Sequence, residues 1–223
     1  AIDRSRHHAS IATTRARVTS RVGVVADTHS PEFAPELPKR VFDILSGVEL
    51  ILHAGDIDGQ STIDALSLLA PVVAVKGDHD TKLSLPRHRE VSVGGKRIVV
   101  IHGDRSRWIE EPQTFLWTVS LGYHRPHGRL PRTLRHRFPD ADVIVFGHTH
   151  SPYIKEIEGA LLFNPGGVHQ WTPETTRQRL TQKIGWFEWS WLQVARHIRM
   201  HPRPSVGLLE IDGEVIVPKV IEL

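Results

Sequence analysis

The sequence contains no cysteine among its 223 residues. That absence excludes a disulfide-stapled scaffold, a thiolate metal site and a cysteine nucleophile. It is compatible with a reducing compartment, so we expect the protein in the cytoplasm. The sequence also has no apolar run near the roughly 18 residues of a membrane-spanning helix, so we expect no association with a membrane.

The sequence also lacks a strong excess of positive or of negative charge. The chain has 28 Lys and Arg against 25 Asp and Glu, a net charge of +3. This slight excess of base suits a phosphorylated small-molecule substrate, and it leaves nucleic acid possible without indicating it. A homo-oligomer also remains possible. The length allows a sizeable buried core.

Acidic residues are scarce at the start of the chain, where Asp3 is the only one in residues 1–20. Arginines are frequent in this segment, and it lacks the apolar region of a secretory signal. We therefore expect residues 1–20 to form a basic N-terminal arm. Residues 21–223 are expected to be a single domain with insertions at about 105–139 and 171–204.

Short β-branched runs alternate with helical spacing in the first third of the chain. The runs Val22–Ala26, Leu50–His53 and Val72–Val75 are typical of buried parallel strands. Between them we expect a helix over residues 35–46 and another capped by Ser61-Thr62 and ending at Pro71. This alternation predicts βαβ units.

The second half predicts three hairpins, whose turns are Gly94-Gly95, Glu158-Gly159 and Asp212-Gly213. The spacing of apolar residues around Trp191 predicts an amphipathic helix in the second insertion. Together the two halves predict an α/β fold of two packed mixed sheets with helices outside.

Carboxylate and imidazole side chains follow five of the apolar runs. Because ligands collect at the carboxyl ends of parallel strands, these side chains are expected to meet. Oxygen and imidazole donors suit Mn²⁺, Fe²⁺, Ni²⁺, Co²⁺ or Zn²⁺. The set is too large for one tetrahedral site and about large enough for two ions ~3.5–4 Å apart. Its members are Asp27, His29, Asp56, Asp78, His79, His102, His148 and His150.

Asp27 and His29 are two positions apart, as are His148 and His150. Side chains two positions apart share one face of an extended strand but are separated by roughly 6–7 Å along it, so we expect the polypeptide to turn at these pairs for both members to bind one metal. We expect Gly55, Gly77 and Gly147, which precede ligand candidates, to permit such turns.

These motifs resemble the signature of the calcineurin-like metallophosphoesterases, notably their small bacterial and archaeal phosphodiesterase branch. The resemblance covers roughly residues 20–168 and the last hairpin, and it implies a four-layer αββα sandwich. The matching segments are Asp27-Thr28-His29, Gly55-Asp56, Gly77-Asp78-His79-Asp80, His102-Gly103, Gly147-His148-Thr149-His150 and the turn Asn164-Pro165-Gly166-Gly167.

The resemblance implies two divalent metal ions, with Mn²⁺ favoured and Fe, Ni²⁺, Co²⁺ or Zn²⁺ as alternatives. It also implies a dinuclear phosphoesterase, acting on phosphodiesters rather than monoesters, in which a metal-bridging hydroxide attacks phosphorus. His79 would stand near the leaving-group oxygen, stabilising charge or donating a proton. One metal would be bound by Asp27, His29 and His150, the second by Asp78, His102 and His148, with Asp56 bridging.

The sequence departs from the family pattern at Asp78, where the family usually has Asn. The added charge would tighten divalent binding, favour a harder ion or repel substrate phosphate. Asp80 or Asp58 is expected to orient His79. Arg105 and Arg107 are close enough to His102 in sequence to reach a substrate phosphate.

The other histidines have no motif support. We expect His53 to be a packing residue or a support of a ligand. The rest are expected on the surface or in loops, namely His124, His127, His136, His169 and His201.

Two other functions compete with hydrolysis of small phosphoesters. One is a catalytically inactive scaffold that binds a protein through the tryptophan-rich segment at 171–204. The other is a metal-dependent nuclease that uses the basic insertions to hold a strand. The tryptophans themselves are expected to pack in the core or at a subunit interface.

Overall fold

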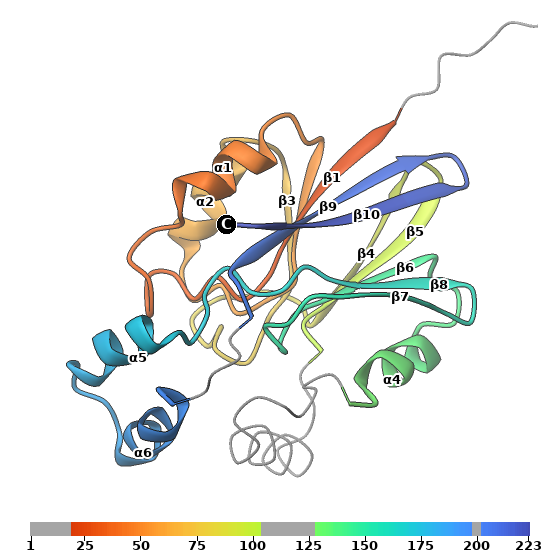
Figure 1. Cartoon of the computed structure of the whole chain (residues 1–223). Coiled ribbons are helices and arrows are strands. Elements are labelled where there is room, and N and C mark those ends of the chain that lie inside the picture. Colours follow the sequence, from red (N-terminus) through yellow and green to blue (C-terminus); the bar gives the residue numbers. More distant parts are fainter. Residues whose placement is uncertain (1–18, 104–127, 198–201) are drawn as a thin grey trace, which may run out of the picture.

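The computed structural model describes residues 19–103, 128–197 and 202–223. Two five-stranded sheets pack against each other, with helices on the outside (Figure 1). This arrangement confirms the predicted α/β fold of two mixed β-sheets flanked by helices. The predicted basic arm lies outside the described residues as far as residue 18.

The first sheet is arranged around β1 (Ser20–Val25), which pairs in parallel with β2 (Leu50–His53). β2 in turn pairs in parallel with β3 (Val72–Ala74). On its other side β1 pairs antiparallel with β9 (Ser205–Asp212), and β10 (Val215–Glu222) forms the edge of the sheet. The predicted parallel strands and the last hairpin are confirmed.

The second sheet has the order β4-β5-β6-β8-β7. The hairpin of β4 (His88–Val93) and β5 (Lys96–Ile101) was predicted from its two glycines. β6 (Val143–Phe146) pairs in parallel with β5 and with β8 (Ala160–Asn164). β7 (Tyr153–Ile157) completes the predicted second hairpin with β8.

The core between the sheets is made of apolar side chains from both. Val24 and Leu52 of the first sheet lie in one cluster with Val100, Val145 and Phe163 of the second, and all are fully buried. Burial of each such side chain contributes roughly 1.5–3 kcal/mol. This packing fixes the carboxyl ends of β1, β2, β5 and β6 relative to one another, and the ligand candidates follow those ends.

The helices cover the outer faces. α1 (Lys39–Leu45) and α2 (Gln60–Ser67) pack on the first sheet, and α4 (Leu130–Arg137) packs on the second. α5 (Pro173–Leu180) and α6 (Trp186–Ala195) lie together at one corner of the molecule, in blue at the lower left of Figure 1. α6 confirms the helix predicted in the second insertion. Within the described part of the chain, no helix is long and apolar enough to cross a membrane.

Two helix boundaries differ from the prediction. α1 begins at Lys39 and not at residue 35, because Pro38 at its N-cap has an extended backbone with ψ of 136°. Ser61-Thr62 do not cap α2, whose N-cap is Gly59. The Thr62 hydroxyl instead donates a hydrogen bond to the Ser30 carbonyl at 2.9 Å, so it ties α2 to the loop after β1.

Candidate metal centre

The predicted ligand residues come together at the carboxyl ends of β1, β2, β3, β5 and β6. Their nitrogen and oxygen atoms form four overlapping groups, within each of which one atom per residue lies within 4.8 Å of the others. Only the described residues contribute to these groups. The groups are Asp27, His29 and His150; Asp78, His102 and His148; Asp27, Asp56 and His102; and His29, Asp56 and His79.

The turns that aim these side chains are made by the ligand candidates themselves. Five of them have a left-handed backbone, with φ of 51° at Asp27, 46° at His29, 55° at Asp56, 67° at His148 and 50° at His150. Such conformations cost non-glycine residues about 1–3 kcal/mol each and collect at functional sites. They curl the chain, so that side chains two positions apart converge on one site instead of being spread along a strand.

Only one of the three glycines expected to permit turns has a left-handed backbone. Gly55 does have a positive φ of 89°, as expected of a turn. Gly77 is needed for close approach instead, since a Cβ atom there would lie 2.2 Å from Asp56 Oδ1. At Gly147 a Cβ atom would come within 3.0 Å of the Ala54 carbonyl oxygen. The prediction that Gly77 and Gly147 supply the turn is therefore wrong.

Three imidazoles have their Nδ1 atoms held by oxygen acceptors. His102 Nδ1 lies 2.8 Å from the Ala54 carbonyl, His150 Nδ1 2.9 Å from the His169 carbonyl, and His29 Nδ1 3.3 Å from Asp58 Oδ2. In the neutral imidazole, donation from Nδ1–H leaves Nε2 as a lone-pair donor, the usual support of a metal-binding histidine.

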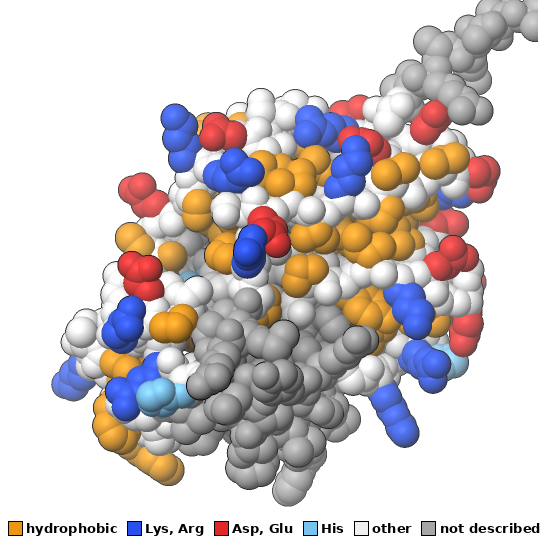
Figure 2. Space-filling model, in the orientation of Figure 1, with side chains coloured by type: hydrophobic (Ala, Val, Ile, Leu, Met, Phe, Trp, Pro, Cys, Tyr) orange, Lys and Arg blue, Asp and Glu red, His pale blue; other side chains and the backbone are white. Residues whose placement is uncertain are grey.

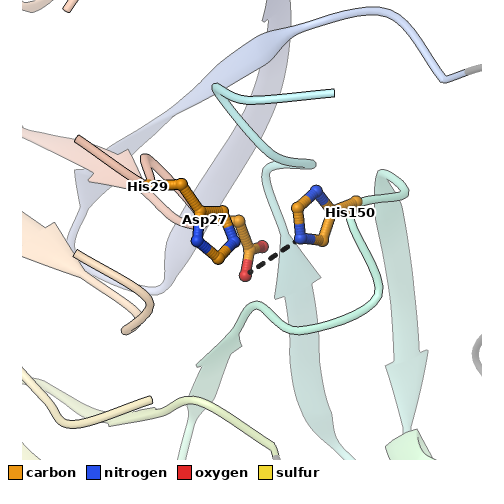
Figure 3. Close-up of side chains that lie close together, drawn as sticks. All are labelled: Asp27, His29 and His150. Carbon is orange, nitrogen blue, oxygen red and sulfur yellow. Dashed lines mark ion pairs between the residues drawn. The ribbon is translucent and has the colours of Figure 1, made fainter. Parts of the chain in front are cut away.

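The free Nε2 atoms face carboxylates. His102 Nε2 and His29 Nε2 lie 3.4 and 3.6 Å from Asp56 Oδ2, and His150 Nε2 lies 3.8 Å from Asp27 Oδ1. Figure 3 shows the imidazoles of His29 and His150 on either side of the Asp27 carboxylate. An ion with ligand distances near ~2.1 Å fits between such atoms.

Two buried atoms of this cluster make no hydrogen bond, namely Asp27 Oδ2 and His102 Nε2. Buried polar atoms nearly always have partners, and a metal ion is one of the few explanations for an orphan. The donor set of carboxylates and imidazoles is also the one that divalent transition metals take. The residues present therefore fit the metals that the family resemblance implies.

Burial and neighbouring charge shift the pKa values of these groups. Burial, helped by nearby His150, lowers the pKa of His29 to about 3, so His29 is neutral and able to bind metal at pH 7. Burial would also lower the pKa of His102, but the Asp56 carboxylate overrides it and raises that pKa to about 10. The same pairing holds the pKa of Asp56 well below its ordinary value, against the effect of burial.

Asp80 has a different role from the one predicted. Its fully buried carboxylate accepts hydrogen bonds from four backbone N–H groups, those of Asp56, Ile57, Asp58 and Gly77, at 2.8–3.0 Å. It therefore joins the loop after β2 to the loop after β3. Of the two residues expected to orient His79, Asp80 is therefore engaged elsewhere, and Asp58 Oδ2 lies 3.3 Å from Nδ1 of the His29 ring.

His79 lies at the exposed edge of the cluster. Its ring contacts His29 edge-on, with 4.9 Å between ring centroids, and its backbone N–H donates to Asp56 Oδ1 at 3.0 Å. The loop thus fixes the backbone of His79 beside the metal ligand candidates while the imidazole remains open to an incoming molecule.

His169 was predicted to be a surface or loop residue; it lies in the loop between β8 and α5, but it is buried and not on the surface. Only 6% of its surface is exposed, and its N–H donates to the Asp27 carbonyl at 2.9 Å. Its carbonyl holds His150, and its ring contacts Trp171 with 4.9 Å between centroids. The signal that sequence reasoning overlooked is its place directly after the Asn164–Gly167 turn, which returns the chain to the end of β1.

The remaining histidines and arginines named from the sequence lie either within or outside the described residues. His53 is fully buried, with Nε2 3.1 Å from the Thr28 hydroxyl, which fits the predicted supporting role. His136 is exposed, as predicted. Arg105 and Arg107, like His124, His127 and His201, lie outside the described residues.

Comparisons with known proteins bear on the family and the fold of the chain. Residues 21–184 match the family model of the calcineurin-like phosphoesterase superfamily domain. A probable metallophosphoesterase from Methanothermobacter thermautotrophicus is 33% identical over 202 residues, which cover 90% of this chain and 91% of the relative.

Two solved structures show the fold. Vps29 from Cryptosporidium parvum has a TM-score of 0.63 at 21% identity, with 92% of each chain covered. A protein described as a novel archaeal phosphodiesterase has a TM-score of 0.51 at 17% identity, covering 90% of this chain and 99% of that one. At these identities the likeness concerns the architecture alone.

Proposed function

The chain belongs to the calcineurin-like phosphoesterase superfamily, and on that premise we propose that it is a dinuclear metal-dependent phosphodiesterase. The observation that carries the proposal is the position of Asp56 between two ligand groups. Its Oδ2 atom lies 3.6 Å from His29 Nε2 and 3.4 Å from His102 Nε2. A carboxylate so placed is suited to bridge two ions.

In this proposal Asp27, His29 and His150 hold the first ion, and Asp78, His102 and His148 hold the second. When bound, two divalent ions would supply a water of lowered pKa and neutralise charge on the phosphoryl oxygens. Mn²⁺ is the proposed ion, with Fe, Co²⁺, Ni²⁺ and Zn²⁺ as alternatives that suit the same donors.

The proposed catalytic residue is His79. Its imidazole is exposed at the edge of the cluster, and its backbone is fixed by the hydrogen bond to Asp56. From there it can donate a proton to, or stabilise charge on, the oxygen that leaves phosphorus. The preference for small phosphodiesters rests on the family branch and on the archaeal phosphodiesterase of like fold.

A protein-binding scaffold is the second candidate, because one observation favours it. Trp186 and Trp189 on α6 are 80% and 51% exposed, and large exposed apolar side chains often mark a docking surface. Figure 2 shows hydrophobic side chains at that corner. The same face shows Lys and Arg scattered among Asp and Glu, so its described part offers no continuous basic track for a nucleic acid strand.

The test is reconstitution of the metal-free protein with Mn²⁺, Fe²⁺, Co²⁺, Ni²⁺ or Zn²⁺, followed by assays with aryl phosphate diesters and monoesters. We expect two ions per chain and faster turnover of the diester with at least one metal. Stoichiometric metal without turnover of either ester would refute the enzyme. A protein that takes up no stoichiometric metal would favour the scaffold.

A further inference from the structure

A stack of three side chains links the proposed first metal group to helix α5. The Phe33 ring stacks on His29 with 4.9 Å between centroids and 28° between planes. The guanidinium carbon of Arg179 lies 4.7 Å from the centroid of the same ring. Arg179 comes from α5, far in sequence from the strand end that carries His29.

These contacts decide what Phe33 can do. An aromatic ring beside a phosphoesterase site invites the interpretation of a platform for a substrate base. Here, however, His29 stacks on the ring and Arg179 lies over it, while His79 and Trp171 pack against it at 5.7 and 5.0 Å between centroids. A ring with these neighbours supports the protein itself.

Arg179 is itself held in place. Its guanidinium pairs with Glu188 of α6 at 2.7 and 3.4 Å, and its Nη1 donates to Gln182 Oε1 at 2.6 Å. Only 16% of the Arg179 side chain is exposed. A guanidinium fixed by a carboxylate in this way cannot swing toward a substrate phosphate without losing that pair.

The other end of α5 is tied to the same metal group. The Thr175 hydroxyl donates to the Gln170 carbonyl at 2.7 Å, and the Gln170 amide donates to the His150 carbonyl at 2.7 Å. Helix α5 therefore reaches His150 from its first turn and His29 from its last. By contrast, the described contacts of His102 come from the loops after β1, β2 and β6 and include no residue of α5.

We propose that Arg179 and Phe33 are positioning residues that hold His29 in its metal-binding orientation, so that α5 tunes the affinity of the first metal group and not of the second. The inference rests on the proposed metal-binding function. His29 has a left-handed backbone and a single side-chain hydrogen bond of 3.3 Å, to Asp58. The stack with Phe33 adds to the ring contacts that His29 makes with His79, His150 and His169, and it is the contact that α5 can influence through Arg179.

The experiment is a calorimetric titration of the metal-free full chain with Mn²⁺. His150→Ala and His148→Ala identify which binding step belongs to which group. In Arg179→Met the step lost in His150→Ala should weaken roughly tenfold, the scale found when supports of metal ligands are removed. The other step should stay within about twofold, and Arg179→Lys, which keeps a positive charge but not the planar fork held by Glu188, should recover only part of the loss.

Arg177→Met is the matched control, because Arg177 lies on the same helix and is exposed. Should Arg179→Met not fold, Glu188→Gln removes the charge of the carboxylate partner while leaving the guanidinium present, and it should weaken the same step about threefold. Equal weakening of both steps, or no change in either, overturns the inference. A wild-type chain that binds no Mn²⁺ would instead overturn the proposed function.

Discussion

Asp80 gives the sharpest test of how the site is built, because one buried carboxylate holds two loops together. Its Oδ1 accepts the N–H groups of Ile57 and Asp58, and its Oδ2 accepts those of Asp56 and Gly77. In Asp80→Asn the remaining side-chain oxygen can still accept hydrogen bonds from two of the four N–H groups. The new amide group points its own hydrogens at the other two N–H donors.

The expected cost follows from those four bonds. A hydrogen bond to a charged group contributes about 1.5–3 kcal/mol, and two such bonds are lost. We therefore expect a fall of roughly 4 kcal/mol in the free energy of unfolding. For a chain of this size that corresponds to a Tm lower by roughly 8–16 °C.

The assay is thermal and urea unfolding of the metal-free protein, followed by circular dichroism. Asp64→Asn is the control, since Asp64 is exposed and its bond from Gln60 lies on the helix surface, and it should change stability by less than about 0.5 kcal/mol. If the free energy of unfolding of Asp80→Asn lies within about 1 kcal/mol of the wild-type value, the two-loop role of Asp80 is refuted.

Two further predictions concern the metals. Asp56→Asn should abolish diester turnover and lower metal occupancy. His79→Ala should lower turnover roughly 10²–10⁴-fold and retain the metal. Equal metal loss in both variants, measured by elemental analysis, would contradict these roles. Because the pKa of His102 is raised to about 10, its proton must leave before Nε2 binds metal, so metal affinity should rise as pH rises from 7. Calorimetry at pH 7 in buffers of different ionisation enthalpy should then show release of about one proton per chain, and no release would count against the raised pKa.

The strands that frame the site could be predicted from sequence because they are buried on both faces. Val22 to Val25 and Val143 to Phe146 have no polar side chain, and strands of this kind appear as continuous apolar runs. Parallel pairing then places the polar residues after them at one edge of the sheets. Parallel pairing brings Asp27 and Asp56 together at one edge of the first sheet, and the packing of the two sheets brings His148 of the second sheet to them.

What could not be predicted depends on contacts between distant loops. The positive φ values at Asp27 and His29 are imposed by backbone hydrogen bonds from these residues to Gly55 and Asp56, which no local pattern reveals. Asp80 is next to His79 in sequence and could be its partner, yet its carboxylate accepts three backbone N–H groups of the loop after β2 and one from Gly77 in its own loop. His169 lacked a motif and is buried because Val168 and His169 bond to the end of β1.

The central claim is that two ions share the Asp56 carboxylate. Electron paramagnetic resonance of the Mn²⁺-loaded protein tests it most directly, because two Mn²⁺ ions at ~3.5–4 Å couple magnetically. We predict a coupled multiline spectrum for the wild type and an isolated six-line signal or no bound metal for Asp56→Asn. A wild-type protein that shows only isolated Mn²⁺ would contradict the claim.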